Sequence, residues 1–407
     1  MGKSLKSMML YLISGRSATS NCIGRKIPEV TIVMNQLIST ELLCGGDLKG
    51  GNGQGSESHK MMSAAEYHAK WYRKNAFINL LTRSVSELKD MFHNYETYKY
   101  ISQSDKKYDM IWERSSRLHW AGIFYANKHG IPCVLEWKDS LITYRYSLFH
   151  CVATRMERWK NKNSDFIIVE SQVLKDMLIK EGINGGKIYI AYNAVNPEEF
   201  HKNTTQGSII RHQLGISSNE IVVGYVGSYA FYHDSIRMIL AASVMRSRGK
   251  NNVRWILIGS GKDEKQCRDL AVKEGLYGKE VLMIPQIDKY LVPQYLSAMD
   301  ITILPGSTDI ICPIKVMEYM AAKSVVLVPD FACNREVINE NNGLLFKPFN
   351  ENSIADALCK VCDDASLREK LAENAYKTVI EHFTWDKTYG DVLKNILDKL
   401  ERNYSLD

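Results

Sequence analysis

The sequence lacks any hydrophobic run long enough to cross a membrane. The chain has 407 residues and is 45% hydrophobic, yet no apolar stretch approaches the ~20 residues that a spanning helix needs. The run at 8–13 is too short for a signal-peptide core and no small-residue cleavage pattern follows it, so we interpret it as a strand. The composition predicts a globular protein with two separate hydrophobic cores.

Cysteine spacing provides no disulfide framework. The nine cysteines are odd in number and scattered, which is typical of reduced thiols and predicts a cytoplasmic protein. The C-x-x-C pair Cys359 and Cys362 lies in a helical stretch and has no second pair with which to form a zinc site. We interpret these two residues as ordinary helix positions.

Charge is modest and uneven along the chain. Of the net +6, residues 1–200 contribute 27 basic against 20 acidic residues, and residues 201–407 contribute 25 against 26. No basic run occurs, so nucleic-acid binding is not supported. The first half is the one expected to face an anionic acceptor or an anionic membrane, and association with the cytoplasmic face of a membrane remains an alternative.

Several ligand-binding signatures are also missing. The glycine-rich segment 43–58 contains no Gly-Lys-Ser/Thr and follows no strand–helix pattern, which excludes a Walker loop and a dinucleotide fingerprint, and with it a dehydrogenase. We expect a surface loop there, with a substrate lid as the alternative. No Asp-x-Asp occurs, so we expect neither a metal-held diphosphate nor any other metal site.

Two sets of alternating strands and helices are present, which predicts an α/β protein with parallel sheets. A polar linker is expected at 201–219, and the helical segment 59–79 carries basic and aromatic residues that suit either a membrane surface or ordinary packing. Strands are expected at 8–13, 29–34, 108–113, 131–137, 165–170 and 187–192, and then at 221–226, 254–258, 281–284, 301–304, 325–328 and 344–346. Helices are expected at 116–129, 145–161, 351–382 and 386–401.

The segment 304–322 is the most informative part of the sequence. A buried strand leads into a polar loop, and Pro313 then opens a helix that carries Lys315 and, one turn later, Glu318. Free amides at a helix N-terminus and a cation suit a phosphate, while a carboxylate suits sugar hydroxyls. The motif therefore predicts a nucleotide-sugar site, although a solvated helix face would have the same pattern.

Other strand ends of the second set also have turn residues that can meet a ligand. Because the carboxyl ends of parallel strands gather ligands, we expect these residues to join the same site. The candidate donor-binding residues are Gly227, Ser228, His233, Gly259, Gly261, Lys262, Gln286, Asp309, Cys312, Pro313, Ile314, Lys315 and Glu318.

The order of these motifs resembles retaining glycosyltransferases of the GT-B fold, in family 4 (group 1). The segments that carry the resemblance are 225–228 with His233, 257–262, 298–305, 313–321, 336–338, 342–345 and 383–385, and more loosely 108–114, 131–136, 169–171 and 193–200. The resemblance implies two Rossmann-like domains whose parallel sheets face a central cleft. We expect an acceptor-side domain at 1–200, a donor-binding domain at 201–385, and a helix at about 386–407 that packs back on the first domain.

The resemblance also implies a mechanism and identifies two departures. Glu318 is similar to the second glutamate of the family's pair, which binds the ribose, whereas Ile310 occupies the place of the first. Ser228 and His233 stand near the usual diphosphate clamp, so Lys315, Lys262 and the helix N-terminus would neutralise the leaving phosphate. The implied reaction is same-face substitution without a covalent enzyme intermediate, with no cofactor and with UDP as the expected nucleotide.

Polar residues beside two strands of the first set are candidates for the acceptor side. We expect Glu113 and Arg114, and likewise Glu136 to Asp139, to lie just past strand ends. Glu136 or Asp139 would orient the acceptor hydroxyl as catalytic residues beside Lys315 and Glu318, and Glu113, Arg114, Trp137 and Lys138 would contact the acceptor. Ordinary polarity at strand ends is the alternative.

These observations predict a hexosyltransferase acting on a glycan, glycolipid or small-molecule acceptor in surface polysaccharide, glycolipid or natural-product synthesis. The main alternative is a catalytically impaired protein of the same fold that serves as the binding subunit of an active transferase, because the first glutamate and the clamp residues are altered. An epimerase or phosphorylase on the same fold is a third hypothesis.

Overall fold

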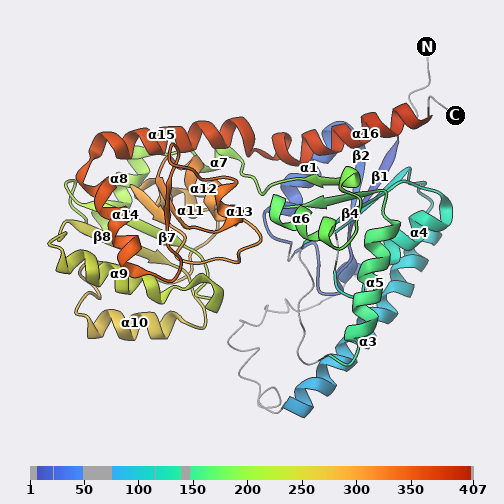
Figure 1. Ribbon diagram of the computed structural model, residues 1–407, viewed down its shortest axis with the longest axis horizontal. Helices are drawn as coiled ribbons and strands as arrows, with labels where there is room; N and C mark the ends of the chain where they lie inside the picture. Colours follow the sequence, from blue (N-terminus) through green and yellow to red (C-terminus); the bar gives the residue numbers. More distant parts are fainter. Residues whose placement is uncertain (1–6, 22, 49–75, 115, 139–146, 405–407) are drawn as a thin grey trace. The chain divides into compact units, whose positions relative to one another are not determined.

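The computed structural model describes residues 7–21, 23–48, 76–114, 116–138 and 147–404 (Figure 1). The chain divides into two compact units, and each is described by itself. The first holds the described residues up to Tyr192 together with the segment that begins at Trp385, and the second is Asn193–Thr384. Among the described helices, none is both long and apolar enough to span a bilayer.

The first unit is built on a six-stranded parallel sheet in the order β2-β1-β3-β4-β5-β6. Its strands are β1 (Met8–Ile13), β2 (Ser39–Cys44), β3 (Met110–Arg114), β4 (Cys133–Glu136), β5 (Phe166–Val169) and β6 (Ile188–Ile190). Its helical segments are α1 (Lys26–Leu37), η1 (Gly45–Leu48), α3 (Ala76–Gln103), α4 (Ala121–His129), α5 (His150–Asn163), α6 (Gln172–Lys180), η3 (Gly185–Lys187), η5 (Asp386–Gly390) and α16 (Asp391–Tyr404).

Helices cover both faces of this sheet. The chain moves from β1 to β2 in one direction and from β2 through β3 to β6 in the other, so right-handed crossovers place α1 on one face and α3, α4 and α5 on the opposite face. The last segment, η5 and α16, packs beside α1 (Figure 1). The buried centre of the sheet is almost entirely apolar, as in β1, where Met9, Leu10 and Leu12 are fully buried.

The expected strand at 29–34 is wrong, because these residues form part of α1. Val30, Val33 and Met34 are buried whereas Ile32 is 57% exposed, which is a helical rather than an alternating pattern. The β-branched residues misled the prediction, since packing of one helical face outweighs strand propensity. The second strand is instead β2, which the apolar pattern of the sequence did not reveal.

The glycine-rich segment begins inside regular structure. Leu43 and Cys44 end β2, and Gly45–Leu48 form the 3-10 helix η1, so the expectation of no element is wrong for these residues. A Cβ on Gly46 would lie 2.6 Å from the carbonyl oxygen of Ala18, so the turn after β2 has room only for glycine. Residues 49–58 lie outside the described part, as does most of the predicted helix 59–79, whose last four residues begin α3.

The second unit repeats the architecture with strand order β12-β11-β10-β7-β8-β9, again all parallel. Its strands are β7 (Ile221–Val226), β8 (Val253–Ile258), β9 (Val281–Ile284), β10 (Ile301–Ile303), β11 (Val325–Pro329) and β12 (Leu344–Phe346). Its helical segments are α7 (Pro197–Phe200), α8 (Thr204–Gln213), η4 (Phe231–His233), α9 (Ile236–Ser247), α10 (Glu264–Lys273), α11 (Val292–Ser297), α12 (Ile314–Ala321), α13 (Ala332–Arg335), α14 (Glu351–Asp363) and α15 (Ala365–His382).

Two expectations for this unit require correction. The predicted polar linker 201–219 contains α8, whose N-cap Asn203 accepts a hydrogen bond from the amide of Gln206 and which packs against α11. The predicted helix 351–382 is two helices, because Asp364 has extended backbone and caps α15 through the amide of Leu367. Both corrections come from side-chain caps, which local polarity alone did not reveal.

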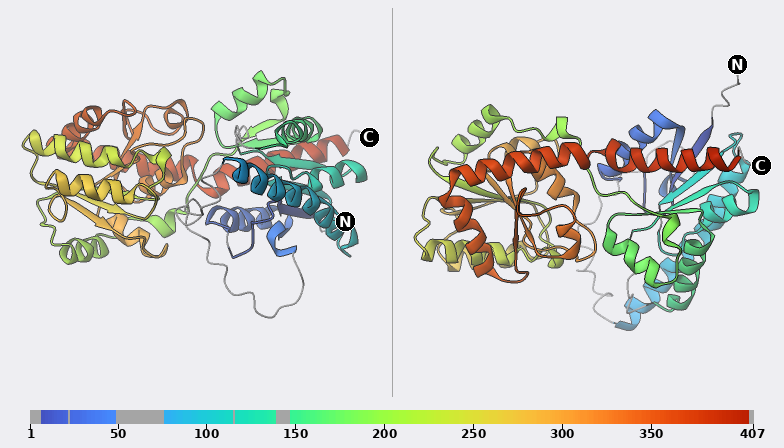
Figure 2. Two further views of the ribbon diagram at one scale, coloured as in Figure 1. Left: turned by 90° about the horizontal axis from the view of Figure 1, so that it is seen from below. Right: turned by 45° about the horizontal axis from the view of Figure 1, so that its top comes forward.

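The remaining elements of both sheets match the expected strands within a few residues, so the predicted pair of parallel sheets with interleaved helices is confirmed. The domain roles assigned to 1–200 and 201–385 stay predictions. Figure 2 shows the same elements from two further directions.

Candidate functional site

The candidate donor site lies where the strand order of the second unit reverses. Strand β7 has β10 on one side and β8 on the other. Helix α9 follows β7 and helix α12 follows β10, and right-handed crossovers place these two helices on opposite faces of the sheet. A parallel sheet opens a crevice at such a point, beyond the carboxyl ends of the strands. The loops after β7 and β10 meet there.

Lys315 lies on the first turn of α12, and its side chain reaches the loop after β7. The helix begins after Pro313, which is its N-cap residue. A Cβ on Gly227 would lie only 2.4 Å from the Nζ atom of Lys315, so the ammonium group lies against the glycine at the end of β7. The same ammonium group lies 5.0 Å from the ring centroid of Tyr225, a cation–π geometry.

His233 fixes the other side of the ammonium group. Its Nδ1 atom lies 3.1 Å from the carbonyl oxygen of Gly306, and its Nε2 atom lies 3.4 Å from Nζ of Lys315. A carbonyl only accepts, so the proton is on Nδ1, and the bare Nε2 accepts from Lys315. His233 is 6% exposed. The predicted donor-binding residues Gly227, His233 and Lys315 therefore converge.

The electrostatics of this pair follow from burial. Desolvation lowers the pKa of Lys315 to about 8, against an opposing effect of Glu318, which stabilises the ammonium form. Desolvation, followed by the charge of Lys315, lowers the pKa of His233 to about 4. His233 is therefore neutral near pH 7, and the lysine remains the cation of the pair.

Two tyrosines that were not among the predicted site residues hold the strand ends in place. The hydroxyl of Tyr319 on α12 donates to the carbonyl oxygen of Val226 at 3.1 Å and accepts from its amide at 2.9 Å, which ties the helix to the end of β7. The hydroxyl of Tyr225 donates to the carbonyl oxygen of Ser228 at 2.8 Å. Both tyrosines lie within segments that carry the family resemblance, and this was the one feature of the sequence that could have identified them as site residues.

Glycines allow the neighbouring loops to approach each other. Gly259 has φ +145°, and a Cβ there would lie 1.9 Å from the carbonyl oxygen of Gly227. Gly261 has φ +158°, and its Cβ would lie 2.6 Å from the carbonyl oxygen of Tyr229. The loops after β7 and β8 are therefore in backbone contact, which larger residues would prevent.

The other predicted donor residues lie on the same edge of the sheet. Ser228, Lys262, Gln286 and Asp309 are exposed, and Gln286 accepts a hydrogen bond from the Ser260 hydroxyl at 3.1 Å. Cys312 is buried, and its carbonyl oxygen accepts from the side chain of Asn193. Pro313, Ile314 and Glu318 are half-buried on α12 and its N-cap. Their contact with a ligand stays a prediction.

The expected positions of Glu113 and Glu136 are wrong. Glu113 lies within β3, is fully buried, and accepts a hydrogen bond from the amide of Ile123 at 2.9 Å. Glu136 is the last residue of β4 and is also fully buried. Neither carboxylate lies past its strand end as predicted. Each accepts hydrogen bonds from groups inside the first unit instead.

Glu136 is the centre of a buried ionic network. It accepts hydrogen bonds from the hydroxyls of Tyr11 and Tyr389, each at 3.0 Å, and from the guanidinium of Arg114. Lys26 pairs with Glu170 at 2.5 Å and lies 3.8 Å from Glu136. Although burial opposes ionisation, Arg114 and Lys26 lower the pKa of Glu136 to about 2.

This network also accounts for Arg114, which was expected to meet an acidic acceptor. Its guanidinium is bonded to Glu136 and lies 3.8 Å from Glu170. Trp137 is 2% exposed and donates from Nε1 to Glu157 at 2.7 Å, whereas Lys138 is exposed. Asp139 lies outside the described residues.

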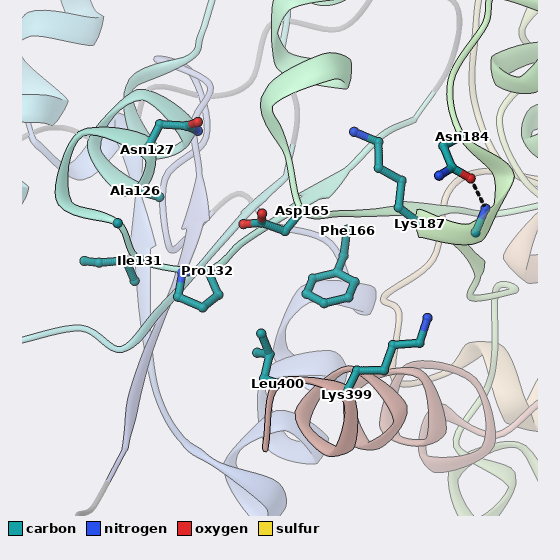
Figure 3. Close-up of a pocket in the computed structure, with 12 residues that line it drawn as sticks. Ala126, Asn127, Ile131, Pro132, Asp165, Phe166, Asn184, Lys187, Lys399 and Leu400 are labelled. Carbon is teal, nitrogen blue, oxygen red and sulfur yellow. Dashed lines mark hydrogen bonds between the residues drawn. The ribbon is translucent and has the colours of Figure 1, made fainter. Parts of the chain in front are cut away.

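A cavity of about 620 Å³ occurs in the first unit, at the amino-terminal ends of β4, β5 and β6 (Figure 3). Two of its charged groups are engaged in hydrogen bonds within the protein. Lys187 donates to the carbonyl oxygens of Asn161, Lys162 and Ser164, and Asp165 accepts from the amide of Cys133. Ligands of open parallel sheets bind at the carboxyl ends of the strands, and this cavity lies at the opposite, amino-terminal ends.

Within the described residues, no three His, Cys, Asp or Glu side chains are close enough together to hold a metal ion. Eight cysteines are described and all are free, including Cys359 and Cys362 on α14.

Two family models match this chain in succession. The model described as glycosyl transferases group 1 matches residues 206–378, and the model described as glycosyltransferase family 4 matches residues 62–199. The first of these contains every residue of the site around Lys315. Together the two models reach into both units.

Curated relatives are glycosyltransferases by name. An uncharacterized glycosyltransferase of Methanocaldococcus jannaschii is 30% identical over 49% of this chain and 51% of its own length. The α-D-kanosaminyltransferase of Streptomyces kanamyceticus is 22% identical over 60% of this chain and 65% of its own length. The chain thus spans about half to two thirds of these two relatives. The UDP-Gal:α-D-GlcNAc-diphosphoundecaprenol α-1,3-galactosyltransferase of Escherichia coli is 23% identical over 75% of this chain and 79% of its own length.

Solved structures share the fold at low identity. Anabaena HepE, solved with UDP and glucose, has a TM-score of 0.67 and 14% identity over 96% of this chain and 100% of its own. Sucrose-phosphate synthase from Thermosynechococcus elongatus has a TM-score of 0.68 and 16% identity over 97% and 100%. The predicted GT-B fold with two Rossmann-like domains is confirmed.

Proposed function

Because this chain belongs to the group 1 glycosyltransferases and has the GT-B fold, we propose that it transfers a sugar from a nucleotide-sugar donor to a glycan, glycolipid or small-molecule acceptor. The observation that carries the proposal is the position of Lys315. Its ammonium group lies at the reversal point of the second sheet, against Gly227 and beside the first turn of α12. A cation at this place can stabilise the negative charge of a diphosphate leaving group.

The proposed reaction proceeds with retention and without a metal ion. Lys315, supported by the amides at the start of α12, stabilises the negative charge that develops on the leaving diphosphate. Glu318 lies one helical turn after Lys315 and accepts hydrogen bonds from ribose hydroxyls. A phosphate oxygen of the donor takes the proton of the acceptor hydroxyl, so that the protein supplies positioning and charge stabilisation.

The proposed donor is a UDP-hexose. Anabaena HepE was solved with UDP and glucose, and the relative from Escherichia coli is named for UDP-Gal, which supports uridine over the other bases. The acceptor name of that relative, a diphosphoundecaprenol glycolipid, supports a glycolipid among the three acceptor classes. With such an acceptor, the protein would work at the cytoplasmic face of an anionic membrane.

The binding-subunit alternative is not favoured. Matches to glycosyltransferase models in both units and transferases among the named relatives support an enzyme. The altered clamp has a partial substitute in Lys315, since the pKa of about 8 leaves the group charged near pH 7.

A ligand screen tests the proposal. The full chain is titrated with UDP-, GDP-, ADP- and dTDP-sugars while thermal stability and donor hydrolysis are followed. Ligand at a hundredfold over its dissociation constant stabilises by about 2.7 kcal/mol. We expect stabilisation and slow hydrolysis with UDP-sugars, and loss of both in Lys315→Ala and in Glu318→Ala.

Matched controls are available on α15, where the neighbouring Glu369 and Lys370 are exposed. Glu369→Ala and Lys370→Ala should behave as the parent chain does. No response to any donor, or equal effects of the control substitutions, would overturn the proposed site. Once an acceptor is found, the anomeric configuration of the product and its insensitivity to a chelator test retention and metal independence.

A further inference from the structure

Helix α3 presents a row of apolar side chains to solvent. Leu81, Val85, Leu88, Phe92 and Tyr95 follow one another at intervals of four and three residues, which is the spacing of one helical face. They are 46%, 52%, 41%, 73% and 69% exposed, in that order. The row is about 21 Å long.

The opposite side of α3 explains why this face is outermost. Glu87, Asn94 and Thr97 are buried, and the side chain of Asn94 donates to the carbonyl oxygen of Leu118 and accepts from the amide of Trp120. These polar groups, together with the buried Ile101 and the ring of Tyr98 on Phe124 and Tyr125, hold the helix to the first unit, and its apolar row points outward. A solvent-exposed apolar row of this length is costly in water and marks an interaction surface.

The helices beside α3 carry charge of one sign. α3, α4 and α5 lie side by side on one face of the first sheet (Figures 1 and 2). Their exposed charged side chains are six cations and one anion, namely Lys89, Lys99, Lys128, Arg155, Arg158 and Lys162 against Glu96. Helix α15 of the second unit provides a contrast, since its exposed charges are Lys370 and Lys377 against Glu369 and Glu381.

We propose that the exposed face of α3, with the cations of α4 and α5 around it, docks on an anionic lipid bilayer. Apolar side chains on one helical face suit the boundary between headgroups and acyl chains, while lysine and arginine around them suit anionic headgroups. A second copy of the chain would bring like charges together across the interface, which disfavours self-association. The inference builds on the membrane contact proposed above and assigns it to α3, α4 and α5.

Vesicle sedimentation tests this assignment. The full chain is mixed with vesicles of phosphatidylcholine alone and with vesicles in which phosphatidylglycerol replaces part of the phosphatidylcholine. We expect binding to the anionic vesicles that weakens with salt. Val85→Gln with Phe92→Gln should reduce binding roughly tenfold by removing apolar contact, and Arg155→Gln with Arg158→Gln should reduce it by a similar factor.

Controls use equally exposed residues elsewhere. Val272 and Tyr290 are 59% and 69% exposed in the second unit, so Val272→Gln with Tyr290→Gln matches the apolar change. Lys370→Gln with Lys377→Gln matches the charge change. Circular dichroism and hydrolysis of soluble donor should be unaltered in all four variants, which separates failure of this surface from failure of the proposed transferase activity.

Three outcomes would overturn the proposal. The first is the absence of binding to anionic vesicles. The second is binding that the α3 substitutions do not weaken, since attraction would then come from charge alone and not from this helix. The third is a dimer in analytical ultracentrifugation that Val85→Gln with Phe92→Gln converts to monomer, because the occupant would then be a second copy.

Discussion

The Nε2 atom of His233 accepts a hydrogen bond from the ammonium group of Lys315 while Nδ1 of the same ring donates to the carbonyl oxygen of Gly306. The neutral imidazole thus joins the loop after β10 to the cation on α12. This arrangement fixes the tautomer of His233, and a protonated ring would have no acceptor to offer Lys315.

The two hydrogen bonds of His233 can be separated by substitution. His233→Asn retains a donor near Gly306 but offers Lys315 no acceptor, whereas His233→Gln retains an acceptor near Lys315. We expect His233→Asn to weaken UDP binding by about 1 kcal/mol, a typical value for one hydrogen bond, and His233→Gln to weaken it less. Calorimetric titration measures both, and equal losses would argue against the acceptor role.

Donor binding should fall as pH rises through about 8, the lowered pKa of Lys315. The cation is lost above that pH, and with it the charge that holds the diphosphate. Lys315→Arg keeps its charge in this range, so its binding profile should be flat over the same pH interval. Parallel profiles for the two proteins would exclude Lys315 as the titrating group.

The lowered pKa of Lys315 should also make the stability of the folded protein depend on pH, but stability should increase with pH where donor binding decreases. Lys315 has its pKa at about 8 in the folded protein and near 10.5 when unfolded. Between these values the unfolded chain binds more protons, so the contribution of Lys315 to the free energy of unfolding increases with pH. Comparing chemical denaturation of the parent chain and Lys315→Met across this interval isolates the effect.

Two glycines of the site should respond differently to alanine. In Gly227→Ala the new Cβ meets side-chain atoms only, the flexible end of Lys315 at 2.4 Å and the hydroxyl of the buried Tyr225 at 2.7 Å, so we expect a folded but somewhat less stable protein with impaired donor binding. In Gly259→Ala the Cβ meets the carbonyl oxygen of Gly227 at 1.9 Å from a backbone with φ +145°, so we expect a loss of at least about 1–3 kcal/mol of stability. Thermal denaturation and UDP titration distinguish the two, and a stable Gly259→Ala would contradict the loop contact.

Tyr389 should contribute to stability through Glu136. Tyr389→Phe removes a buried hydrogen bond to a carboxylate and should cost about 1.5–3 kcal/mol. Glu136→Gln leaves Arg114 and Lys26 short of a buried counter-charge and should cost about 3–5 kcal/mol. Urea denaturation measures both, with the exposed Tyr290→Phe as a control expected to have no effect.

Acid should weaken the same network. The pKa of Glu136 in the folded protein, about 2, lies below that of an unfolded glutamate. Its contribution is therefore complete above the unfolded pKa and is lost as pH falls toward about 2. The stability difference between the parent chain and Glu136→Gln should narrow over this interval, and a constant difference would contradict the ionised network.

The position of Lys315 could be predicted from the sequence better than that of Glu136, and the reason is local geometry. Strand, loop and helix of the segment around Lys315 are consecutive in the chain, so the placement of Lys315 on the first turn of α12 follows from short-range rules. Its contact with Gly227 and His233 required knowing that β7 and β10 are neighbours, which the motif order indicated through the resemblance.

The buried position of Glu136 could not be predicted for a long-range reason. Glu136 has acceptor-like chemistry, but its partners Tyr11, Lys26 and Tyr389 lie far away in sequence. No periodicity or spacing predicts that a tyrosine more than two hundred residues later will fill the hydrogen-bonding capacity of a strand-end carboxylate. The strand misassigned at 29–34 has the same origin, because α1 is helical through packing rather than propensity.

Because η5 and α16 return to the first unit, the two units can complete their cores only in a certain order during synthesis on the ribosome. The described residues of the second unit, Asn193–Thr384, are continuous in sequence and have all been synthesised once Thr384 is added. The first unit is not, because Tyr389, Leu393 and Ile396 of its core are made only afterwards. Until then Glu136 lacks one of its hydrogen-bond donors. We therefore expect the first unit, although its synthesis begins first, to complete its core after the second.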